Sequence, residues 1–331
     1  MAKFDFDKLF SDFSKIKAGV IGDVMLDTYM WGHVERISPE APVPVVALDK
    51  KEYRIGGAGN VALNISSLGA NVSVLSVAGN DDDGKHLKAM FNEQGIGIDF
   101  LLSSAKRITT NKTRIISRNQ QMMRLDSEIT KELEYEDENR LVLAIQNFIA
   151  QENPDVIIFE DYDKGVLTPL VIEKTIALCR QKNIITAVDP KRKNFFNYKH
   201  ATIFKPNIKE VKEGLNIIED IVYEEGLKKV HRSLKEKLNH HISFITLSEK
   251  GVFYQNDKES RIIPSHIRTI SDVSGAGDTV IAVAALVYAA TGDALMMAEI
   301  ANIAGGLVCE EVGTVAVNKE RLLKECKALL G

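Results

Sequence analysis

Cysteine is scarce in this sequence, with only Cys179, Cys309 and Cys326 among 331 residues, and no two of them form a CxxC pair. Their odd number and wide spacing argue against a disulfide scaffold and a structural zinc site, and are typical of a reducing compartment. Long apolar runs are also lacking, because the longest, residues 280–290, falls well short of the roughly 20 residues that span a bilayer. The N-terminal stretch has no apolar core of the kind found in signal peptides. We therefore expect a cytoplasmic protein without a membrane partner.

An excess of charge of one sign is absent too. Lys and Arg number 42 and Asp and Glu number 46, which leaves a net charge of −4 at pH 7. Such a balance gives no overall attraction to nucleic acid, and we expect no nucleic-acid partner. With 45% hydrophobic and 27% charged residues the composition is that of an ordinary globular protein, which excludes a disordered chain. No repeat or Pro/Gly linker divides the sequence, so we predict one domain over residues 1–331.

Short apolar runs rich in β-branched residues alternate with amphipathic stretches along most of the chain. This alternation predicts an α/β fold with a mostly parallel central sheet and helices on both faces. The strands are expected at residues 18–22, 72–77, 156–159, 184–188, 201–204 and 244–247. The helices are expected at residues 60–68, 84–94, 133–150, 169–181 and 220–238.

Two stretches, residues 42–54 and 112–125, look like strands without partner helices. The second has Asn119-Gln120 at its centre, flanked by β-prone residues, which favours a hairpin. We therefore predict a small β-sheet inserted into the main domain, formed by approximately residues 28–56 and 98–126. Ligands bind outside the carboxyl ends of the strands in open α/β sheets, so this insert is expected to serve as a lid or a dimer surface.

The strongest local motif is DVSGAGDT, which begins at Asp272 and leads into an apolar helix expected to end near Gly292. Gly275 and Gly277 allow the backbone to approach a ligand, and the free N–H groups at the helix start favour negative charge. Such a site suits a phosphoryl group during transfer. Asp278 lies in the first turn, where the helix dipole is expected to keep it ionised and able to accept a proton from a hydroxyl. The alternative is that Asp278 only caps the helix.

Other phosphate-binding motifs fail in this sequence. No GxxxxGK[ST] pattern occurs, which excludes a P-loop site. The segment GAGDTV has only part of the Rossmann glycine fingerprint and no acidic residue about 20 positions on, so a nicotinamide dinucleotide site is a weak alternative.

Two further motifs are candidates for binding a polyhydroxyl ligand. The glycine-rich segment RIGGAGN ends at Asn60, whose amide is placed to bind hydroxyl groups unless it merely caps the following helix. Asp23 and Asp27 follow the first predicted strand, and carboxylates at that position usually face the ligand crevice. A solvated strand end is the alternative for this pair.

Polar clusters follow the other predicted strands and are expected to meet at the same sheet edge. Asn207 and Glu210 could share one side of a helical turn and hold Mg²⁺ through water, although the same spacing is that of a simple capping box. Basic residues could bind a substrate phosphate, although each alone reads as solvated surface. They are Lys112, Arg114, Arg118, Arg124, Lys191, Arg192 and Lys193.

The two glycine motifs together resemble the signatures of the ribokinase-like (phosphofructokinase-B) sugar kinases. Longer stretches, among them RISPEAPVPVV and SRNQQMMRLD, are similar to the kinase domain of D-glycero-β-D-manno-heptose-7-phosphate kinases. The resemblance runs from about residue 20 to residue 315. It implies a ribokinase-like three-layer sandwich with an inserted β-lid. It also implies an ATP- and Mg²⁺-dependent carbohydrate kinase that phosphorylates the anomeric C1 hydroxyl of the heptose 7-phosphate, on the route to ADP-heptose and the lipopolysaccharide core.

The resemblance also implies a role for each matching residue. Asp278 would be the catalytic base and Gly275, Ala276 and Gly277 the anion hole. The ATP site would include Asn207, Glu210 (also toward Mg²⁺, through water), Ser248, Gly251 and, near the adenine, Asn302. The sugar would be held by Asp23, Gly57 and Asn60. Further contacts to the sugar and its 7-phosphate would come from Arg114, Asn119, Asp161 and Lys191.

Three expectations about cations and partners complete what the resemblance implies. Asp272 would lie beside a loop that binds a monovalent cation such as K⁺. The lid would pair two subunits in a homodimer. The HxGH motif of an adenylyltransferase does not occur, so adenylyl transfer is expected on a separate polypeptide or on a segment outside this sequence.

Two rival functions stay open at this point. One is a kinase of the same fold that acts on a fructose phosphate, ribose or a nucleoside. The other is a non-catalytic sugar- or nucleotide-binding regulator on the same scaffold, which would be marked by loss of the base or of the glycine hole; this sequence keeps both.

Overall fold

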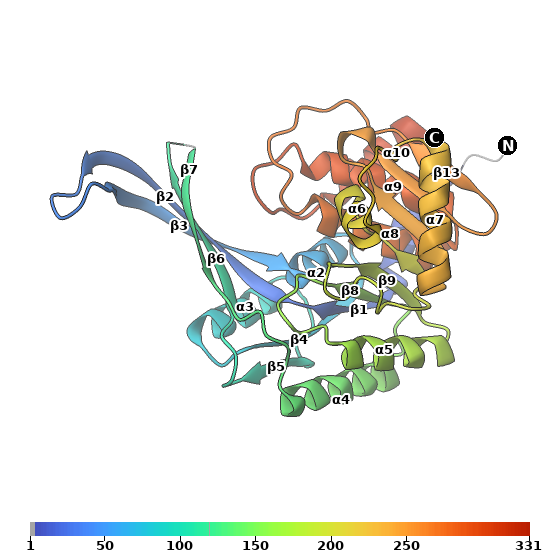
Figure 1. The fold of residues 1–331 in the computed structure, drawn as a ribbon, viewed down its shortest axis with the longest axis horizontal. Coiled ribbons are helices and arrows are strands. Elements are labelled where there is room, and N and C mark those ends of the chain that lie inside the picture. Colours follow the sequence, from blue (N-terminus) through green and yellow to red (C-terminus); the bar gives the residue numbers. More distant parts are fainter. Residues whose placement is uncertain (1–3, 119) are drawn as a thin grey trace.

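A computed structural model of the chain describes residues 4–118 and 120–331, so the predicted contact of Asn119 lies outside the described residues. Its centre is a nine-stranded sheet of order β13-β12-β11-β10-β9-β8-β1-β4-β5 (Figure 1). The strands are β1 (Lys17–Gly22), β4 (Asn71–Gly79), β5 (Leu101–Ser104), β8 (Val156–Glu160), β9 (Ile185–Asp189), β10 (Ile203–Phe204), β11 (Ile242–Thr246), β12 (Val252–Gln255) and β13 (Ser260–Ile263). All neighbours pair in parallel except β11 with β12 and β12 with β13.

Helices cover both faces of this sheet. They are α1 (Phe6–Asp12), α2 (Ala58–Ser67), α3 (Asp82–Glu93), α4 (Tyr135–Glu152), α5 (Pro169–Gln181), α6 (Ile208–Leu215), α7 (Glu224–Leu238), α8 (Ala276–Thr291), α9 (Ala294–Val308) and α10 (Lys319–Leu330), with 3-10 turns η1 (Phe13–Lys15) and η2 (Ser248–Lys250). The fold is therefore the predicted three-layer α/β sandwich. No helix in the described part of the chain is long and apolar enough to cross a membrane.

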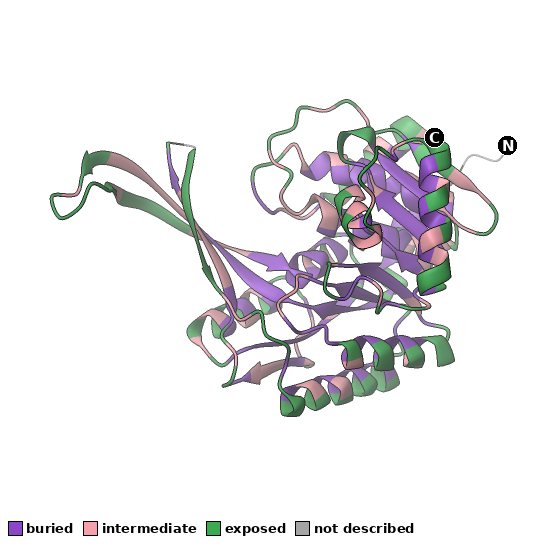
Figure 2. Ribbon diagram, in the orientation of Figure 1, coloured by how far each residue is buried: buried purple, intermediate pink, exposed green. Residues whose placement is uncertain are grey.

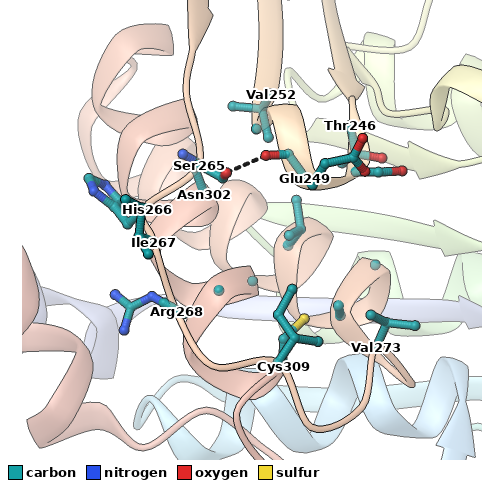
Figure 3. A pocket seen from close by; sticks show the side chains of 18 residues that line it. Thr246, Glu249, Val252, Ser265, His266, Ile267, Arg268, Val273, Asn302 and Cys309 are labelled. Carbon is teal, nitrogen blue, oxygen red and sulfur yellow. Dashed lines mark hydrogen bonds between the residues drawn. The ribbon is translucent and has the colours of Figure 1, made fainter.

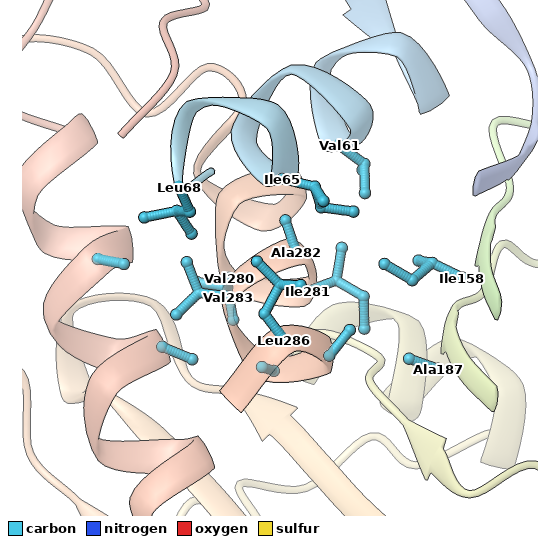
Figure 4. Packing of buried hydrophobic residues seen from close by; sticks show 14 of the residues in the cluster. Val61, Ile65, Leu68, Ile158, Ala187, Val280, Ile281, Ala282, Val283 and Leu286 are labelled. Carbon is cyan, nitrogen blue, oxygen red and sulfur yellow. The ribbon is translucent and has the colours of Figure 1, made fainter. Parts of the chain in front are cut away.

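Alternate side chains of the strands enter two separate hydrophobic cores. On β8, Ile158 packs with residues of α2, α8 and α9, whereas Ile157 and Phe159 pack with α4, α5 and α7. Figure 2 shows the buried strands between these layers, and Figure 4 shows α8 packed against Val61 and Ile65 of α2. Helix α8 is buried at every position from Asp278 to Val287, as expected for a helix that is apolar all round. Its first turn is therefore held by the core.

The predicted lid is a separate four-stranded sheet of order β3-β2-β6-β7 that projects from the body (Figure 1). Its strands are β2 (Val24–Ile37), β3 (Pro44–Gly57), β6 (Thr110–Ser117) and β7 (Gln120–Ser127). The lid begins at Val24, earlier than the expected residue 28, because the chain continues from β1 into β2 with only Asp23 between them. Its second segment begins at Thr110 and not near residue 98, because β5 pairs with β4 in the main sheet.

The six predicted strands and five predicted helices are all present, with small shifts at their ends. The largest shift is at α7, which begins at Glu224 instead of residue 220, because the side chain of Asp220 accepts a hydrogen bond from Val222 N in a preceding turn. Helix α9 was not predicted, since its sequence ALMMAEIANIAGGLV has no polar face and contains two glycines. The antiparallel pair β12 and β13 was not predicted either.

Candidate active site

The N-terminus of α8 opens at the carboxyl ends of the parallel strands. Gly275 caps the helix in the left-handed conformation, with φ of 78°, and no side chain caps the first amides. A Cβ on Gly275 would lie 2.8 Å from Asn60 Nδ2 and 2.9 Å from Thr314 Cγ2, so only glycine fits. Next to it, a Cβ on Gly277 would have no atom nearer than 3.7 Å. The helix end is therefore open to an anionic ligand, as the glycine motif predicts.

Asp278 sits in the first turn of α8 and is held by two donors. Asn60 Nδ2 donates to its Oδ2 over 2.7 Å, and the Tyr162 hydroxyl donates to its Oδ1 over 2.8 Å. The carboxylate does not cap its own helix, and Asn60 lies inside α2 rather than at its N-cap, which is Gly57. Both simple capping alternatives are therefore wrong.

The pKa of Asp278 is higher than the helix dipole alone would give, although the carboxyl stays ionised at neutral pH as expected. Burial raises its pKa to about 6, and Asp189 adds to the rise, while the hydrogen bonds from Asn60 and Tyr162 and the charge of Lys205 lower it. The sequence predicts that the helix dipole keeps this carboxyl ionised. Burial outweighs the dipole, so Asp278 is ionised only above about pH 6 and is matched to proton transfer near neutrality.

A pocket of about 450 Å³ lies in front of Asp278 and is lined by three lysines, Lys191, Lys205 and Lys209, of which the first two pair with carboxylates at its wall. Lys205 Nζ is 2.7 Å from Asp189 Oδ2, with both side chains buried, and Lys191 Nζ is 2.6 Å from Glu210 Oε1. These cations, with the amides of α8, fit the phosphates of a nucleotide. The structure places Lys191 in this pocket, and its predicted contact with the sugar or its phosphate stays a prediction.

Asn207 and Glu210 form the capping box of α6. Asn207 Oδ1 accepts from Glu210 N over 2.9 Å, and Glu210 Oε2 accepts from Asn207 N over 2.8 Å. The simple alternative from the sequence is thus realised, and a role of Glu210 toward Mg²⁺ stays a prediction. Within the described residues no three His, Cys, Asp or Glu side chains are grouped to hold a metal. Mg²⁺ fits this pocket if phosphates and water supply most of its ligands.

Glu160 ends β8 and had no role assigned to it from the sequence. Both carboxyl oxygens are buried and have no hydrogen-bond partner among the described residues. Burial, Asp189 and Asp278 together raise its pKa well above the ordinary value, which indicates a neutral carboxyl. Lys205 was missed as well, and the signal for it is that a lysine directly follows a buried strand.

A second pocket of about 530 Å³ joins the first at Gly277. Ser248, Gly251 and Asn302 line it, so the structure brings these three predicted ATP-site residues together. Figure 3 shows this pocket, with Asn302 labelled. Asn302 Nδ2 donates to Pro264 O over 2.9 Å and fixes one wall. Much of the remaining lining is apolar, including Val252, Val280 and Cys309, which suits the planar base of a nucleotide.

Asp23 is buried and binds three backbone amides. Its Oδ2 accepts from Tyr162 N and Lys164 N over 3.0 and 3.1 Å, and its Oδ1 accepts from Val166 N over 3.0 Å. Burial, and then the neighbouring Asp161, raise its pKa to about 6. Asp23 thus anchors the loop after β8, and its predicted contact with the sugar stays a prediction.

Asp161 is likewise held by hydrogen bonds within the protein. Its carboxylate accepts hydrogen bonds from the Tyr198 hydroxyl over 2.7 Å, from Asn194 Nδ2 over 3.2 Å and from Asp163 N over 2.9 Å. The side chain thus points into the protein, because a buried carboxylate needs hydrogen-bond donors and these donors lie there. Its neighbour Tyr162 reaches Asp278 instead.

The sugar side of the cleft is formed by Asp27 and the lid. Asp27 Oδ1 is 2.6 Å from Arg114 Nη1, and its Oδ2 lies 3.5 Å from Thr314 Oγ1. The structure pairs Arg114 with Asp27, which lies on β2 four residues after Asp23, and the predicted contact of Arg114 with the sugar or its phosphate stays a prediction. Gly57 adopts φ of 59° at the junction of β3 and α2, a turn that favours glycine, and its predicted contact with the sugar stays a prediction.

Asp272 holds the loop before α8. Its Oδ1 accepts from Ser274 N and Oγ over 3.0 and 2.8 Å, and its Oδ2 accepts from Gly313 N over 2.9 Å. These bonds join the two loops that flank the helix end. The predicted monovalent cation beside Asp272 stays a prediction.

Comparison with known proteins supports a kinase. Residues 15–321 match the profile described as pfkB family carbohydrate kinase. The bifunctional protein HldE of Syntrophotalea carbinolica is 40% identical over 97% of this chain and 65% of its own length. The protein of the same name from Geotalea uraniireducens is 39% identical over 98% of this chain and 66% of its own length. The chain thus spans just under two thirds of these relatives.

Solved structures agree in fold. Phosphofructokinase-2 from Escherichia coli, crystallised with potassium, superposes with a TM-score of 0.78 at 16% identity, covering 96% of this chain and 99% of its own. Ribokinase from Arabidopsis thaliana, crystallised with ribose and ATP, superposes with a TM-score of 0.72 at 15% identity, covering 93% of this chain and 99% of its own. The fold is ribokinase-like, and the chain belongs to the pfkB family of carbohydrate kinases.

Proposed function

We propose that this protein transfers the γ-phosphoryl group of ATP to the anomeric C1 hydroxyl of D-glycero-D-manno-heptose 7-phosphate, giving the β-1,7-bisphosphate for ADP-heptose synthesis. One observation carries the proposal: Asp278 lies at an uncapped helix end, in a pocket lined by three lysines, with Asp27 and Arg114 paired at the base of the lid. The choice of heptose rests on the segments RISPEAPVPVV and SRNQQMMRLD, which resemble heptose-7-phosphate kinases. Both segments lie in the lid.

The chemistry follows from the charges around Asp278. Its carboxylate accepts the proton of the sugar hydroxyl as that oxygen attacks phosphorus. The amides of Ala276 and Gly277 and the ammonium groups of Lys191 and Lys205 stabilise the charge on the transferred group. When bound with ATP, Mg²⁺ would offset the charge of the nucleotide phosphates. Burial of Asp278 and Lys205 excludes water, which strengthens these interactions.

The lid binds the 7-phosphate of the sugar in this proposal. Lys112 Nζ has no carboxylate within ion-pair distance in the described part of the chain, and burial lowers its pKa. Arg114 lies two residues further along β6, on the same face of the strand, and binds Asp27. A doubly charged phosphate near these two side chains would supply the missing partner for Lys112.

The remaining expectations are kept as proposals with different support. β7 is exposed along its whole length and carries Met122, Met123 and Leu125, which favours the homodimer through the lid. K⁺ beside Asp272 rests on the family resemblance alone. The relatives are named bifunctional, so they give no support to an adenylyltransferase on a separate chain.

The test is a coupled assay of ADP release with heptose 7-phosphate, fructose 6-phosphate and ribose as acceptors. We expect kcat/KM to be highest for heptose 7-phosphate by at least about tenfold, because a charged group on the substrate is recognised by charged donors. A preference for ribose would overturn the substrate. Absence of turnover with every acceptor, with ATP binding retained, would point to the non-catalytic regulator.

A further inference from the structure

Tyr162 connects the sugar side, the phosphate pocket and the catalytic carboxylate. Its hydroxyl donates to Asp278 Oδ1 over 2.8 Å, and its ring centroid lies 5.4 Å from Lys112 Nζ and 5.6 Å from Lys191 Nζ. Burial and the nearby carboxylates of Asp278 and Glu160 raise the pKa of the phenol well above its ordinary value. The hydroxyl therefore keeps its proton and acts only as a donor.

The backbone that carries Tyr162 is fixed by Asp23. The carboxylate of Asp23 accepts hydrogen bonds from the N–H groups of Tyr162, Lys164 and Val166, all within 3.0–3.1 Å. Asp163 and Gly165 between them have positive φ, 54° and 93°, which makes the turn tight. A buried carboxylate that binds three amides of one loop leaves that loop little freedom, so the phenol is preset before substrate arrives.

Asp278 is thereby held at both oxygens. Tyr162 binds Oδ1, and Asn60 Nδ2 binds Oδ2 over 2.7 Å. A carboxylate oxygen that accepts one hydrogen bond still has a lone pair free, so a sugar hydroxyl can be received by an oriented group. Both hydrogen bonds also favour the charged form and oppose the rise of the pKa that burial causes.

We propose that Tyr162 is a positioning residue for Asp278, fixing its carboxylate toward the sugar hydroxyl, and that Asp23 acts through Tyr162. The proposal rests on the proposed function, in which Asp278 accepts the proton. In that step the O–H bond of the sugar breaks, its proton moves to Asp278 and its oxygen bonds to phosphorus. The phenol keeps its own proton throughout.

The test is Tyr162→Phe, which removes one donor and leaves the ring between the two lysines. We expect kcat to fall about tenfold, because a hydrogen bond to a charged group is lost, with KM for sugar phosphate and ATP within about twofold. The acid limb of the kcat–pH profile should move to higher pH, since the charged form of Asp278 loses a donor. A merely structural role would not move this limb.

The matched control is Tyr198→Phe, in which a phenol is also removed from a buried carboxylate, that of Asp161, away from Asp278. We expect a lower melting temperature and an acid limb at the wild-type position. Wild-type kcat and an unmoved limb in Tyr162→Phe overturn the proposal, as does the same shift of the limb in both variants.

Asp278→Asn separates the two levels of inference. If that variant keeps near-normal turnover, Asp278 is not the proton acceptor and the premise of this inference fails, whereas the proposed function fails only if the wild type phosphorylates no heptose 7-phosphate. If it is inactive while Tyr162→Phe behaves as wild type, only the role of Tyr162 fails. Should Tyr162→Phe melt below the assay temperature, its profile is measured below its melting temperature, where the limb must show the same upward shift relative to wild type.

Discussion

The two sides of the active site differ in how firmly the body of the protein holds them. The α8 side belongs to the body of the protein, and its helix is buried from Asp278 to Val287. The lid side is a ribbon whose burial decreases along β2, from buried at Val24 to exposed at Ile37, and whose β7 is exposed throughout. The core therefore fixes the atoms that we propose for phosphoryl transfer, whereas only the base of the lid is held by the body.

This difference suggests a division of roles, in which the body provides the reaction and the lid provides the choice of substrate. The glycine motifs that resemble sugar kinases in general lie at the start of α2 and α8. The segments that resemble heptose kinases lie on the lid. We expect substitutions at the α8 side to change kcat, and substitutions on the lid to change KM for the sugar.

The largest effect is expected for Asp278→Asn. Removing the proton acceptor should lower kcat by about 10²–10⁴-fold, since this is the usual contribution of a general base. The fold should be kept, because the amide fills the same space. Steady-state ADP release and a thermal melt check this, with the exposed Asp82→Asn as control, and turnover within a factor of about two of wild type would remove Asp278 from the mechanism.

Gly275→Ala should have the next largest effect. A Cβ there meets Asn60 Nδ2 and Thr314 Cγ2 and requires a left-handed residue, so the helix end must shift, and we expect kcat to fall roughly 10–100-fold. Gly292→Ala at the other end of α8 has φ of 66° but no atom within 4 Å of its Cβ. It should cost about 1 kcal/mol of stability with kcat unchanged. Equal loss of kcat in both variants would show that backbone strain, not the site, is responsible.

Arg114→Ala tests the lid side. We expect KM for heptose 7-phosphate to rise about 10–100-fold while KM for ATP stays the same, because a charged hydrogen-bond donor beside Asp27 is lost. Arg124→Ala is the control, since Arg124 is half exposed and pairs with Asp126 on its own strand. A lower kcat with unchanged KM values would break the division between the two sides.

The smallest effect concerns Glu160 and is seen only as a function of pH. The pKa of Glu160 is raised in the folded state. The wild type is therefore not destabilised by Glu160 below the ordinary pKa of a glutamate. It loses folding free energy as the pH rises from that value toward the raised pKa. Glu160→Gln resembles the neutral carboxyl and removes this loss. We expect the variant to gain stability over wild type as the pH rises from about 5 to about 8 in thermal melts, whereas the exposed Glu173→Gln should not. Parallel melting curves for wild type and Glu160→Gln would show that Glu160 is not held neutral.

Much of the fold could be predicted because parallel strands here are apolar on both faces and their helices are amphipathic. The site was located by its glycines, since Gly275 and the segment before Asn60 are positions where the backbone must turn sharply or approach a ligand closely. The partners of the individual carboxylates were harder to predict. Asp23 and Asp27 lie near one strand end, and only the lid strand β2 shows that Asp27 faces Arg114 while Asp23 binds the loop after β8. The sequence holds no signal for this choice, because both are carboxylates at the same sheet edge.

The same limit applies to the residues after β8. Glu160, Asp161 and Tyr162 follow each other, and which of them turns inward depends on donors such as Tyr198, which lies 37 residues from Asp161 in the chain. Long-range contacts of this kind cannot be derived from local patterns.

The most direct measurement is the pH dependence of a single turnover, from about pH 5 to about pH 8, for the wild type and Asp278→Asn. Phosphoryl transfer by the wild type should rise with a single ionisation near pH 6, the pKa to which burial raises Asp278, and the variant should be slow and flat over this range. A wild-type rate without that ionisation, or the same rise in Asp278→Asn, would contradict the account.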